Sequence, residues 1–341
     1  MIVAAAPEAL TPARKRPRTV YEARGLVRTY AGPRESLRRP PAQLQALRGV
    51  SLAIAAGETL GIVGESGSGK STLVRILLAL DQPQAGVVEY EGEQVSGLAE
   101  SRLRRLRREV QVVFQDPASS LDPRMRVGDT VAEPLRSLRV AGDQQARVAE
   151  VLAAVGLEAD AARRYPHQFS GGQRQRIAIA RALAPGPRVL FADEPVSALD
   201  VSVRAQILNL LRDLKQRLDL TLVLVSHDLS VVRHVCDQVM VMYLGRVVEA
   251  GPTGDVFASP QHPYTRLLLE SAPTLSGPPP RPMPGQAPSA SDVPGGCAFH
   301  PRCPLAFDRC LAEDPGLLAG AGVTSRAAAC HLAFTGRVDR L

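Results

Sequence analysis

Eight consecutive residues, 64–71, constrain the fold of this chain more than any other segment. They spell Gly-Glu-Ser-Gly-Ser-Gly-Lys-Ser, and they lie between an apolar run at residues 59–63 and a helical pattern at residues 72–80. Glycines permit a tight turn, and the free N–H groups at the start of the following helix bind anions. Because a strand, a turn and a helix succeed one another here, the segment predicts a phosphate-binding loop in an α/β fold.

The lysine of this loop stands out against the rest of the chain. Lysine occurs only at Lys15, Lys70 and Lys215, although lysine and arginine together number 41. A compact ammonium suits a phosphate loop better than a planar guanidinium does. We therefore expect Lys70 to reach the outer phosphates of a nucleotide and Ser71 to offer its hydroxyl to Mg²⁺. The predicted nucleotide-binding loop consists of Gly64, Glu65, Ser66, Gly67, Ser68, Gly69, Lys70, Ser71 and Thr72.

Length and composition fit an ordinary globular protein. At 341 residues the chain can form one large α/β domain with an extension. No apolar run approaches the roughly 18 residues that a membrane helix needs, and the start of the chain lacks a basic flank and a cleavage site. We therefore expect a cytoplasmic chain that does not span a membrane. Much of the positive charge lies in the tail and in one arginine-rich segment, residues 102–108, which favours a solvated helix face over a nucleic-acid interface.

Apolar runs and amphipathic helices alternate along the chain from residue 20. The expected buried strands of a mostly parallel sheet are residues 57–63, 110–114, 188–192 and 221–225. Helical spacing replaces the strand pattern between about residues 116 and 183, which predicts a helical subdomain. The expected organisation is a disordered tail at residues 1–19, a nucleotide-binding domain at 20–275 and a C-terminal extension at 276–341.

Two of the expected strands deliver polar groups at their ends. Residues 188–195 carry Asp193 and Glu194 at the tip of a buried strand. We expect Asp193 to hold Mg²⁺ and Glu194 to polarise a water aimed at the γ-phosphate. His227 follows the strand at residues 221–225, and nucleotides bind at this edge of open α/β sheets, so His227 is a candidate γ-phosphate contact.

A second glycine-rich turn precedes another helix. Residues 169–176 spell Phe-Ser-Gly-Gly-Gln-Arg-Gln-Arg. The first loop already satisfies one nucleotide, so this turn invites a ligand from elsewhere. Together with the segments at residues 113–117 and 197–200, the order of motifs resembles the ATP-binding subunits of ABC transporters, over residues 20 to about 272.

The resemblance implies roles for further residues and an antiparallel β subdomain beside the parallel sheet. Gln115 corresponds to the residue that links Mg²⁺ to the helical subdomain, and Asp200 corresponds to the dimer-contact loop. Tyr30 matches the aromatic residue that stacks on adenine, although Tyr21 is a competitor. Phe169 stands where the family usually has leucine, and its apolar character is retained.

The resemblance also implies a mechanism. Two subunits pack head to tail, so that each ATP is held by the phosphate loop of one chain and by the second glycine-rich turn of its partner. The implied residues of that turn are Ser170, Gly171, Gly172 and Gln173, and the implied catalytic residues are Glu194, His227, Lys70 and Gln115. ATP binding then closes the dimer and hydrolysis opens it, and the motion passes to membrane subunits.

Further segments point to one branch of the family. Residues 114–125, 165–169, 245–251 and 262–265 resemble the ATPases of oligopeptide and dipeptide importers, and of these the second of two types that pair. Nickel importers share the pattern. The implied role is ATP-driven import of di- or oligopeptides at the cytoplasmic face of the membrane. The implied partners are a second ATPase, identical or paralogous, two permease subunits and, indirectly, an extracytoplasmic substrate-binding protein, with no nucleic acid.

Four of the five cysteines crowd the C-terminal end, whereas Cys236 is expected in the core. Cys297, Cys303, Cys310 and Cys330 are a possible ligand set for a [4Fe–4S] cluster or for structural Zn²⁺, and His300 and His331 could substitute as ligands. Reduced thiols in a small docking lobe are the alternative.

Two functions from other classes compete with transport. A soluble ABC protein acting on ribosomes or DNA usually carries paired cassettes or long coiled coils, and this chain shows neither. A metabolite kinase would use the phosphate loop alone, which leaves residues 170–173 and His227 without a role.

Overall fold

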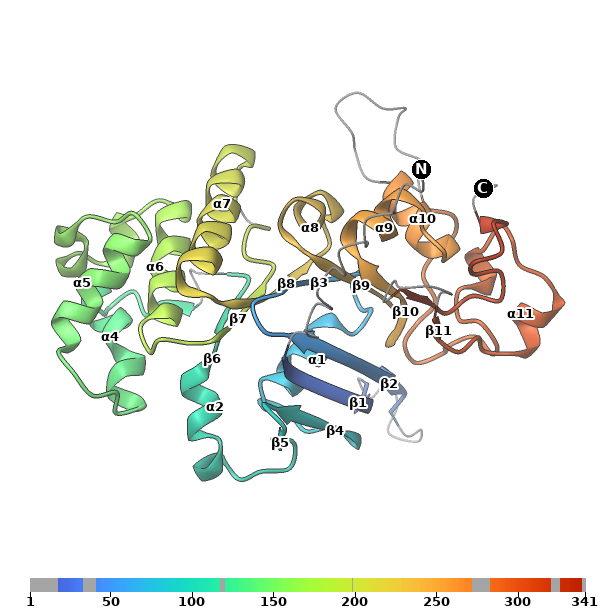
Figure 1. The fold of residues 1–341 in the computed structure, drawn as a ribbon, viewed down its shortest axis with the longest axis horizontal. Helices are drawn as coiled ribbons and strands as arrows, with labels where there is room; N and C mark the ends of the chain where they lie inside the picture. Colours follow the sequence, from blue (N-terminus) through green and yellow to red (C-terminus); the bar gives the residue numbers. More distant parts are fainter. Residues whose placement is uncertain are drawn as a thin grey trace, which may run out of the picture.

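The computed structural model describes residues 18–32, 41–116, 120–197, 199–271, 283–319 and 326–338. The expected disordered tail lies outside the described residues up to residue 17, as do Pro117 and Ala198 of the motifs above and the start of the expected extension, up to residue 282. The described residues form two sheets with helices around them (Figure 1).

The larger sheet has eight strands in the order β11-β12-β10-β9-β3-β8-β7-β6. They are β3 (Thr59–Val63), β6 (Val110–Val113), β7 (Val189–Asp193), β8 (Thr221–Ser226), β9 (Gln238–Tyr243), β10 (Arg246–Pro252), β11 (Leu318–Ala319) and β12 (Ala327–Ala328). Neighbours from β6 to β9 are parallel, whereas the pairings of β10 with β9 and β12, and of β11 with β12, are antiparallel. The expected mostly parallel sheet is confirmed, and its continuous apolar runs are explained by strands such as β3 and β8 that are buried along their whole length.

The smaller sheet is antiparallel, in the order β2-β1-β4-β5, as the family resemblance implied. Its strands are β1 (Thr19–Ala31), β2 (Gln43–Ala55), β4 (Ala85–Tyr90) and β5 (Glu93–Gln94). Tyr21 of β1 is fully buried, lies against the rings of Tyr90 and Phe191, and donates a hydrogen bond from its hydroxyl to the Leu77 carbonyl. Tyr21 is therefore a core residue and not a platform for a base.

Helices cover the larger sheet and extend it at one end. They are α1 (Lys70–Leu77), α2 (Arg104–Glu109), α4 (Val127–Ser137), α5 (Gln144–Ala154), α6 (Gly171–Leu183), α7 (Val201–Leu218), α8 (Leu229–Val235), α9 (Thr253–Ala258), α10 (Pro263–Glu270) and α11 (Asp308–Ala312), with short 3₁₀ turns η1 (Glu100–Arg102), η2 (Ala159–Arg163), η3 (Pro166–Gln168) and η4 (His300–Arg302). Figure 1 places α4, α5 and α6 at one end of the molecule and α11 at the other. The described residues between 116 and 183 contain helices and no strand, in line with the expected helical subdomain.

Helix α1 begins and ends earlier than its apolar pattern predicts. It starts at Lys70 because Gly69, with φ 100°, ends the phosphate loop directly before it. It ends at Leu77 because Ala79, with φ 50°, leaves the helical region. The loop is thus followed at once by the free N–H groups of a helix, which is the arrangement that binds phosphate.

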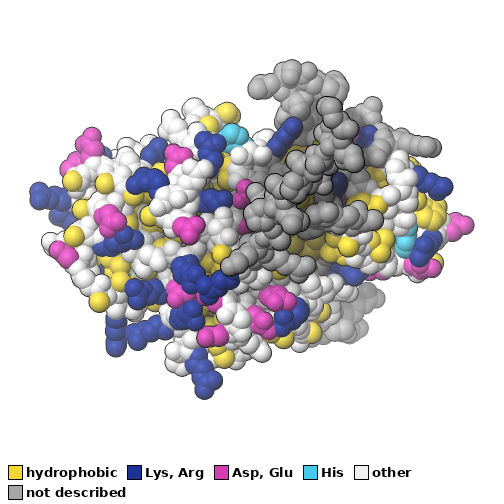
Figure 2. Space-filling model, in the orientation of Figure 1, with side chains coloured by type: hydrophobic (Ala, Val, Ile, Leu, Met, Phe, Trp, Pro, Cys, Tyr) yellow, Lys and Arg dark blue, Asp and Glu magenta, His cyan; other side chains and the backbone are white. Residues whose placement is uncertain are grey.

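The arginine-rich segment forms the surface of α2. Arg105 pairs with Glu109 at 3.1 Å and Arg107 pairs with Glu100 at 2.9 Å. Figure 2 shows basic and acidic side chains interspersed over this part of the molecule. Mixed charge of this kind supports a solvated helix face. Among the described residues, no helix is both long and apolar enough to cross a bilayer.

Candidate nucleotide-binding site

A cavity of about 740 Å³ lies beside the phosphate loop, where β3, β7 and β8 end. Its volume is in the range of small-molecule sites. It is lined by Tyr30, Leu44, Ala46, Ser66, Gly67, Gly69, Lys70, Ser71, Thr72, Gln115, Glu194, His227 and Ala290. The fold therefore brings together most of the predicted nucleotide and catalytic residues of this chain.

Two glycines of the phosphate loop lie in close contact with the backbone of neighbouring strands. A Cβ atom at Gly64 would lie 2.2 Å from the Met242 carbonyl oxygen, and one at Gly69 would lie 2.3 Å from the Ala46 carbonyl oxygen. Only glycine fits at these two positions. Lys70 donates hydrogen bonds from Nζ to the carbonyl oxygens of Gly64 at 2.7 Å and Glu65 at 2.9 Å. Burial lowers the pKa of Lys70, and the carboxylates of Glu194 and Asp193 oppose that shift.

The two acidic residues occupy different backbone environments. Asp193 is the last residue of β7, whereas Glu194 lies just beyond the strand with φ 46°, in the left-handed region. This turn, and not strand alternation, directs the Glu194 side chain into the cavity, and such strained backbone is common at functional sites. Glu194 Oε1 lies 3.2 Å from His227 Nδ1. Burial raises the pKa of Asp193, the charge of Glu194 raises it further, and Lys70 lowers it.

The predicted magnesium ligands supply oxygen donors from three elements. Ser71 and Gln115 line the cavity. Asp193 lies close enough to Lys70 for its carboxylate to raise the pKa of that lysine. Hydroxyl, amide and carboxylate oxygens are the donors that Mg²⁺ prefers. This donor set fits Mg²⁺.

Tyr30 forms one wall of the same cavity. It is half-buried, and the guanidinium carbon of Arg28 lies 4.7 Å from its ring centroid. Its hydroxyl donates to Asp81, which holds the ring in place. Of the two candidate aromatics, Tyr30 is the one that can face a base.

The second glycine-rich turn lies outside this cavity. Ser170 is the N-cap of α6, and Ser170 and Gln173 form a reciprocal capping box, both with exposed side chains. A Cβ atom at Gly172 would lie 2.4 Å from Val203 Cγ1, whereas one at Gly171 would make only an ordinary contact with Leu199 at 3.5 Å. Asp200, the N-cap of α7, is exposed beside Val201, which is 80% exposed. The chain therefore presents Ser170, Gln173 and Asp200 outward and does not bring them to its own phosphate loop, whereas Gly172 is buried.

Three residues of the C-terminal part reach the nucleotide site, and none of them was predicted from the sequence. The Glu65 N–H donates to the Tyr264 hydroxyl at 2.9 Å, and Arg302 contacts the Glu65 carboxylate at 2.8 and 3.0 Å. Ala290 lines the cavity, and its carbonyl accepts from the Gln45 N–H at 2.9 Å. Tyr264 lies in a segment that had served only to indicate a family branch, and Arg302 lies between two of the C-terminal cysteines. No spacing rule linked either residue to the phosphate loop.

The four C-terminal cysteines line one small cavity, together with His262, Phe299, His300 and His331. However, within the described residues no group of three or more His, Cys, Asp or Glu side chains is arranged to hold a metal ion. His300 Nδ1 lies 3.0 Å from the Cys297 carbonyl and His331 Nε2 lies 3.1 Å from the Glu313 carbonyl, so both rings have backbone partners. Among the residues described, the structure thus gathers the four thiols around one cavity but does not arrange three of them as metal ligands.

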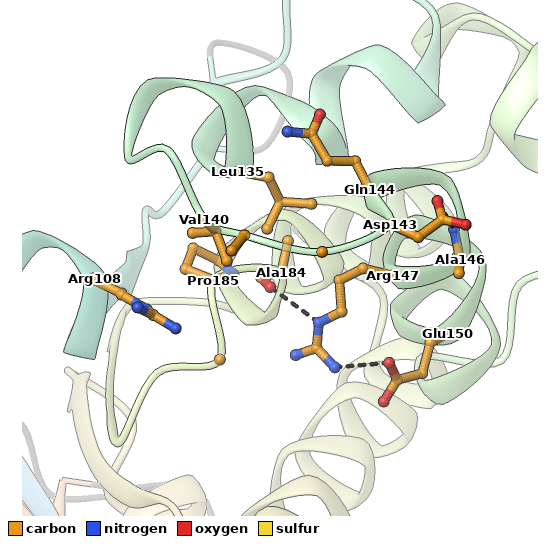
Figure 3. A pocket seen from close by; sticks show the side chains of 13 residues that line it. Arg108, Leu135, Val140, Asp143, Gln144, Ala146, Arg147, Glu150, Ala184 and Pro185 are labelled. Carbon is orange, nitrogen blue, oxygen red and sulfur yellow. Dashed lines mark hydrogen bonds and ion pairs between the residues drawn. The ribbon is translucent and has the colours of Figure 1, made fainter.

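A second hollow, of about 540 Å³, lies between α4, α5 and the loop after α6 (Figure 3). Arg147 points into it, donates from Nε to the Ala184 carbonyl at 3.0 Å and pairs with Glu150 at 2.9 Å. Asp143, Arg147 and Glu150 of this hollow all have side-chain or backbone partners. It contributes no residue to the nucleotide-binding cavity.

The sequence matches two family models and resembles proteins of peptide transport. A family model described as "ABC transporter" matches residues 47–197, and one described as "Oligopeptide/dipeptide transporter, C-terminal region" matches residues 248–310. The di/tripeptide transport ATP-binding protein DppF of Pseudomonas aeruginosa is 48% identical over 318 residues, which cover 92% of this chain and 97% of that protein. This chain belongs to the ABC transporter ATP-binding proteins. The dipeptide transport ATP-binding protein DppF of Haemophilus influenzae is also 48% identical, over 85% of this chain and 90% of that protein.

Solved ABC proteins share the fold. The ATP-binding cassette MJ0796, in a dimeric post-hydrolysis state bound to ADP and Pi, superposes with a TM-score of 0.61 at 33% identity and covers 68% of this chain and 98% of that one. CbiO1 from Clostridium perfringens, part of the transporter complex cbiONQ, gives a TM-score of 0.61 at 28% identity and covers 71% of this chain and 92% of that one. The predicted ABC ATPase fold is confirmed.

Proposed function

We propose that this chain is the ATP-hydrolysing subunit that drives import of di- or oligopeptides across the cytoplasmic membrane. The observation that carries the proposal is the convergence of Lys70, Glu194 and His227 on one cavity from the ends of three neighbouring strands. The peptide-transport names of the most similar relatives and the match to the oligopeptide/dipeptide C-terminal region support the substrate class.

The geometry suggests a role for each residue. The loop N–H groups and Lys70 bind the β- and γ-phosphates of ATP, and Tyr30 stacks on the adenine. Bound Mg²⁺, held by Ser71, Gln115 and Asp193, would neutralise phosphate charge. Glu194 accepts a proton from the attacking water, and His227, 3.2 Å from Glu194, orients that carboxylate and contacts the γ-phosphate.

The exposed side chains of Ser170 and Gln173, which lie outside the chain's own nucleotide cavity, favour a shared active site. We propose that two ATPase chains pack head to tail, so that Ser170, Gly171, Gly172 and Gln173 of one chain contact the ATP bound to the other, and Asp200 lies in the contact between them. The ligated MJ0796 structure is described as dimeric. Closing on ATP and opening after hydrolysis then transmit work to the permease subunits.

We propose a peripheral position at the cytoplasmic face of the membrane. The partners proposed are a second ATPase, most simply a paralogue, two membrane-spanning permeases and, through them, an extracytoplasmic substrate-binding protein. Nickel or another small solute is the alternative cargo. The proposed domain limits are residues 20–275 for the ATP-binding domain, with 116–183 as its helical subdomain, and 276–341 for the extension.

Reconstitution tests the proposal. The chain, copurified with its permeases and partner ATPase in vesicles, should couple ATP hydrolysis to uptake of a labelled di- or tripeptide. Hydrolysis should need no phosphate acceptor, which a kinase would require. Uptake of Ni²⁺ in place of peptide would move the cargo to the alternative class, and copurification with ribosomes or DNA in place of permeases would contradict transport.

For the cysteine cavity we propose [4Fe–4S] ligation by Cys297, Cys303, Cys310 and Cys330. The four thiols share one cavity, and backbone N–H groups of Leu305 and Leu332 point at the sulfurs of Cys303 and Cys330, as donors do around cluster thiolates. Iron and sulfide analysis of anaerobically purified protein tests this proposal. A colourless wild type without iron or zinc would leave reduced thiols as the correct alternative.

A further inference from the structure

The second residue of the phosphate loop is held by the C-terminal part of the chain. Glu65 donates its N–H to the Tyr264 hydroxyl at 2.9 Å, and its carboxylate accepts hydrogen bonds from Arg302 NH1 at 2.8 Å and NH2 at 3.0 Å. Its carbonyl accepts from Lys70 at 2.9 Å. Both C-terminal partners lie within residues 248–310, and Arg302 is 237 residues away from Glu65 along the chain.

Arg302 is buried and held in place on every side. It is 6% exposed, and its Nε donates to the Pro284 carbonyl at 2.9 Å. Its guanidinium carbon lies 5.9 Å from the ring centroids of both Tyr243 and Phe299. A planar guanidinium that binds both oxygens of a carboxylate is the strongest and most directional form of ion pair.

The location of this pair creates an electrostatic problem for nucleotide binding. Glu65 is one of the loop residues that surround a triphosphate, and a lone carboxylate there would repel that polyanion. The Glu65 side chain is only 27% exposed, so water screens its charge incompletely. The pair with Arg302 cancels the charge from outside the loop, without placing another cation against the phosphates.

We propose that Arg302 is a positioning residue for ATP binding, which neutralises Glu65 and thereby lets the phosphate loop accept a nucleoside triphosphate. The inference rests on the proposed ATPase function. It assigns to the oligopeptide/dipeptide C-terminal region a direct part in nucleotide affinity, separate from any metal at the cysteines. A role in packing alone would make the loss of Arg302 independent of the charge on Glu65.

Titration of the full-length chain with Mg-ATP, by competition with a fluorescent ATP analogue, separates these roles. Arg302→Gln should raise the Kd for ATP about tenfold, because it leaves the carboxylate unopposed. Glu65→Gln should bind ATP at least as tightly as wild type. The double variant Arg302→Gln/Glu65→Gln should return to within about twofold of wild type, and Arg302→Lys should lie between wild type and Arg302→Gln.

The matched control is Arg309→Gln, which removes the same charge from an exposed site in the same lobe, where Arg309 pairs with Glu313 at 2.7 Å. Its Kd should equal that of wild type. Unchanged affinity in folded Arg302→Gln, or a double variant weaker than Arg302→Gln, would overturn the inference. Should Arg302→Gln fail to fold, weaker ATP binding by Glu65→Gln would overturn it equally. A wild type that binds no ATP would overturn the proposed function and this inference together, whereas wild-type binding with a failed rescue would remove the inference alone.

Discussion

Helices α1 and α6 both begin with a glycine-rich turn, yet the chain surrounds one and exposes the other. The start of α1 is enclosed by residues of β1 and β2, by the residues that follow β7 and β8, and by Ala290 of the C-terminal part, and Lys70 there is buried. At the start of α6, Ser170 and Gln173 form a capping box with exposed side chains, and neither residue lines the nucleotide-binding cavity. Backbone that can bind an anion therefore does not define a site by itself, because the surrounding chain determines whether the ligand is its own or a partner's.

The largest effect is expected from a substitution in the cavity at the start of α1. Glu194→Gln keeps the size of the side chain but removes its ability to accept a proton. We expect kcat to fall by about two to four orders of magnitude, with ATP binding retained. Steady-state hydrolysis by the assembled complex and ATP titration of the chain measure the two quantities. Unchanged kcat would show that Glu194 is not the base.

A smaller loss of turnover is expected when a charge is introduced at the start of α6. Gly171→Asp introduces a carboxylate where the partner's ATP is proposed to bind, and the position has room for a Cβ atom. Turnover of the complex should fall about a hundredfold through repulsion of the γ-phosphate. ATP binding by the isolated chain should not change, since the residue lies outside its own cavity. Full activity of this variant would contradict the shared active site.

The two adjacent glycines at the start of α6 are expected to differ in their effect on stability. A Cβ atom at Gly172 would lie 2.4 Å from Val203 Cγ1, and a β-branched valine cannot easily move aside. Gly172→Ala should therefore lower the free energy of unfolding by about 1–3 kcal/mol. Gly171→Ala is the matched control and should leave it nearly unchanged. Chemical denaturation measures both, and equal losses would mean that the packing of α6 on α7 is misjudged.

The smallest expected effect concerns Tyr30, whose ring is proposed to stack on the adenine. Tyr30→Ala should weaken ATP binding by about five- to tenfold through loss of stacking. Tyr30→Phe keeps the ring and loses only the hydrogen bond to Asp81, so its affinity should stay close to that of wild type. If both variants bind ATP like the wild type, the adenine lies elsewhere.

Local patterns predicted the parts of the site that are local in the chain. The phosphate loop, the buried strand before Asp193 and the strand before His227 each follow from a short run of residues, and β3, β7 and β8 form where those runs predict them. Tyr21 is buried and Tyr30 lines the cavity, and this difference identifies Tyr30 as the residue that can face a base. The sequence alone could not predict which tyrosine is buried, because β1 contains register shifts that change which side chains face the core.

Long-range contacts escaped prediction for a physical reason. The pair between Glu65 and Arg302 depends on how the C-terminal part packs against the core, and neither residue differs from an ordinary surface charge in its local pattern. The positive φ of Glu194 likewise depends on the Val225 carbonyl, to which its N–H donates at 3.0 Å. The closeness of four cysteines along the chain suggested that they share a site, but their spacing did not predict how the sulfurs are arranged.

The pairing of β12 with β10 has a practical consequence for protein engineering. Ala328 and Ala327 lie opposite Glu249 and Ala250, so the last described strand covers hydrogen-bonding groups of β10. Cutting the gene after residue 275 would bare that border of the sheet, and an uncovered border recruits other polypeptides. Shortened versions should therefore precipitate or associate with themselves, even though every residue of the phosphate loop is still present.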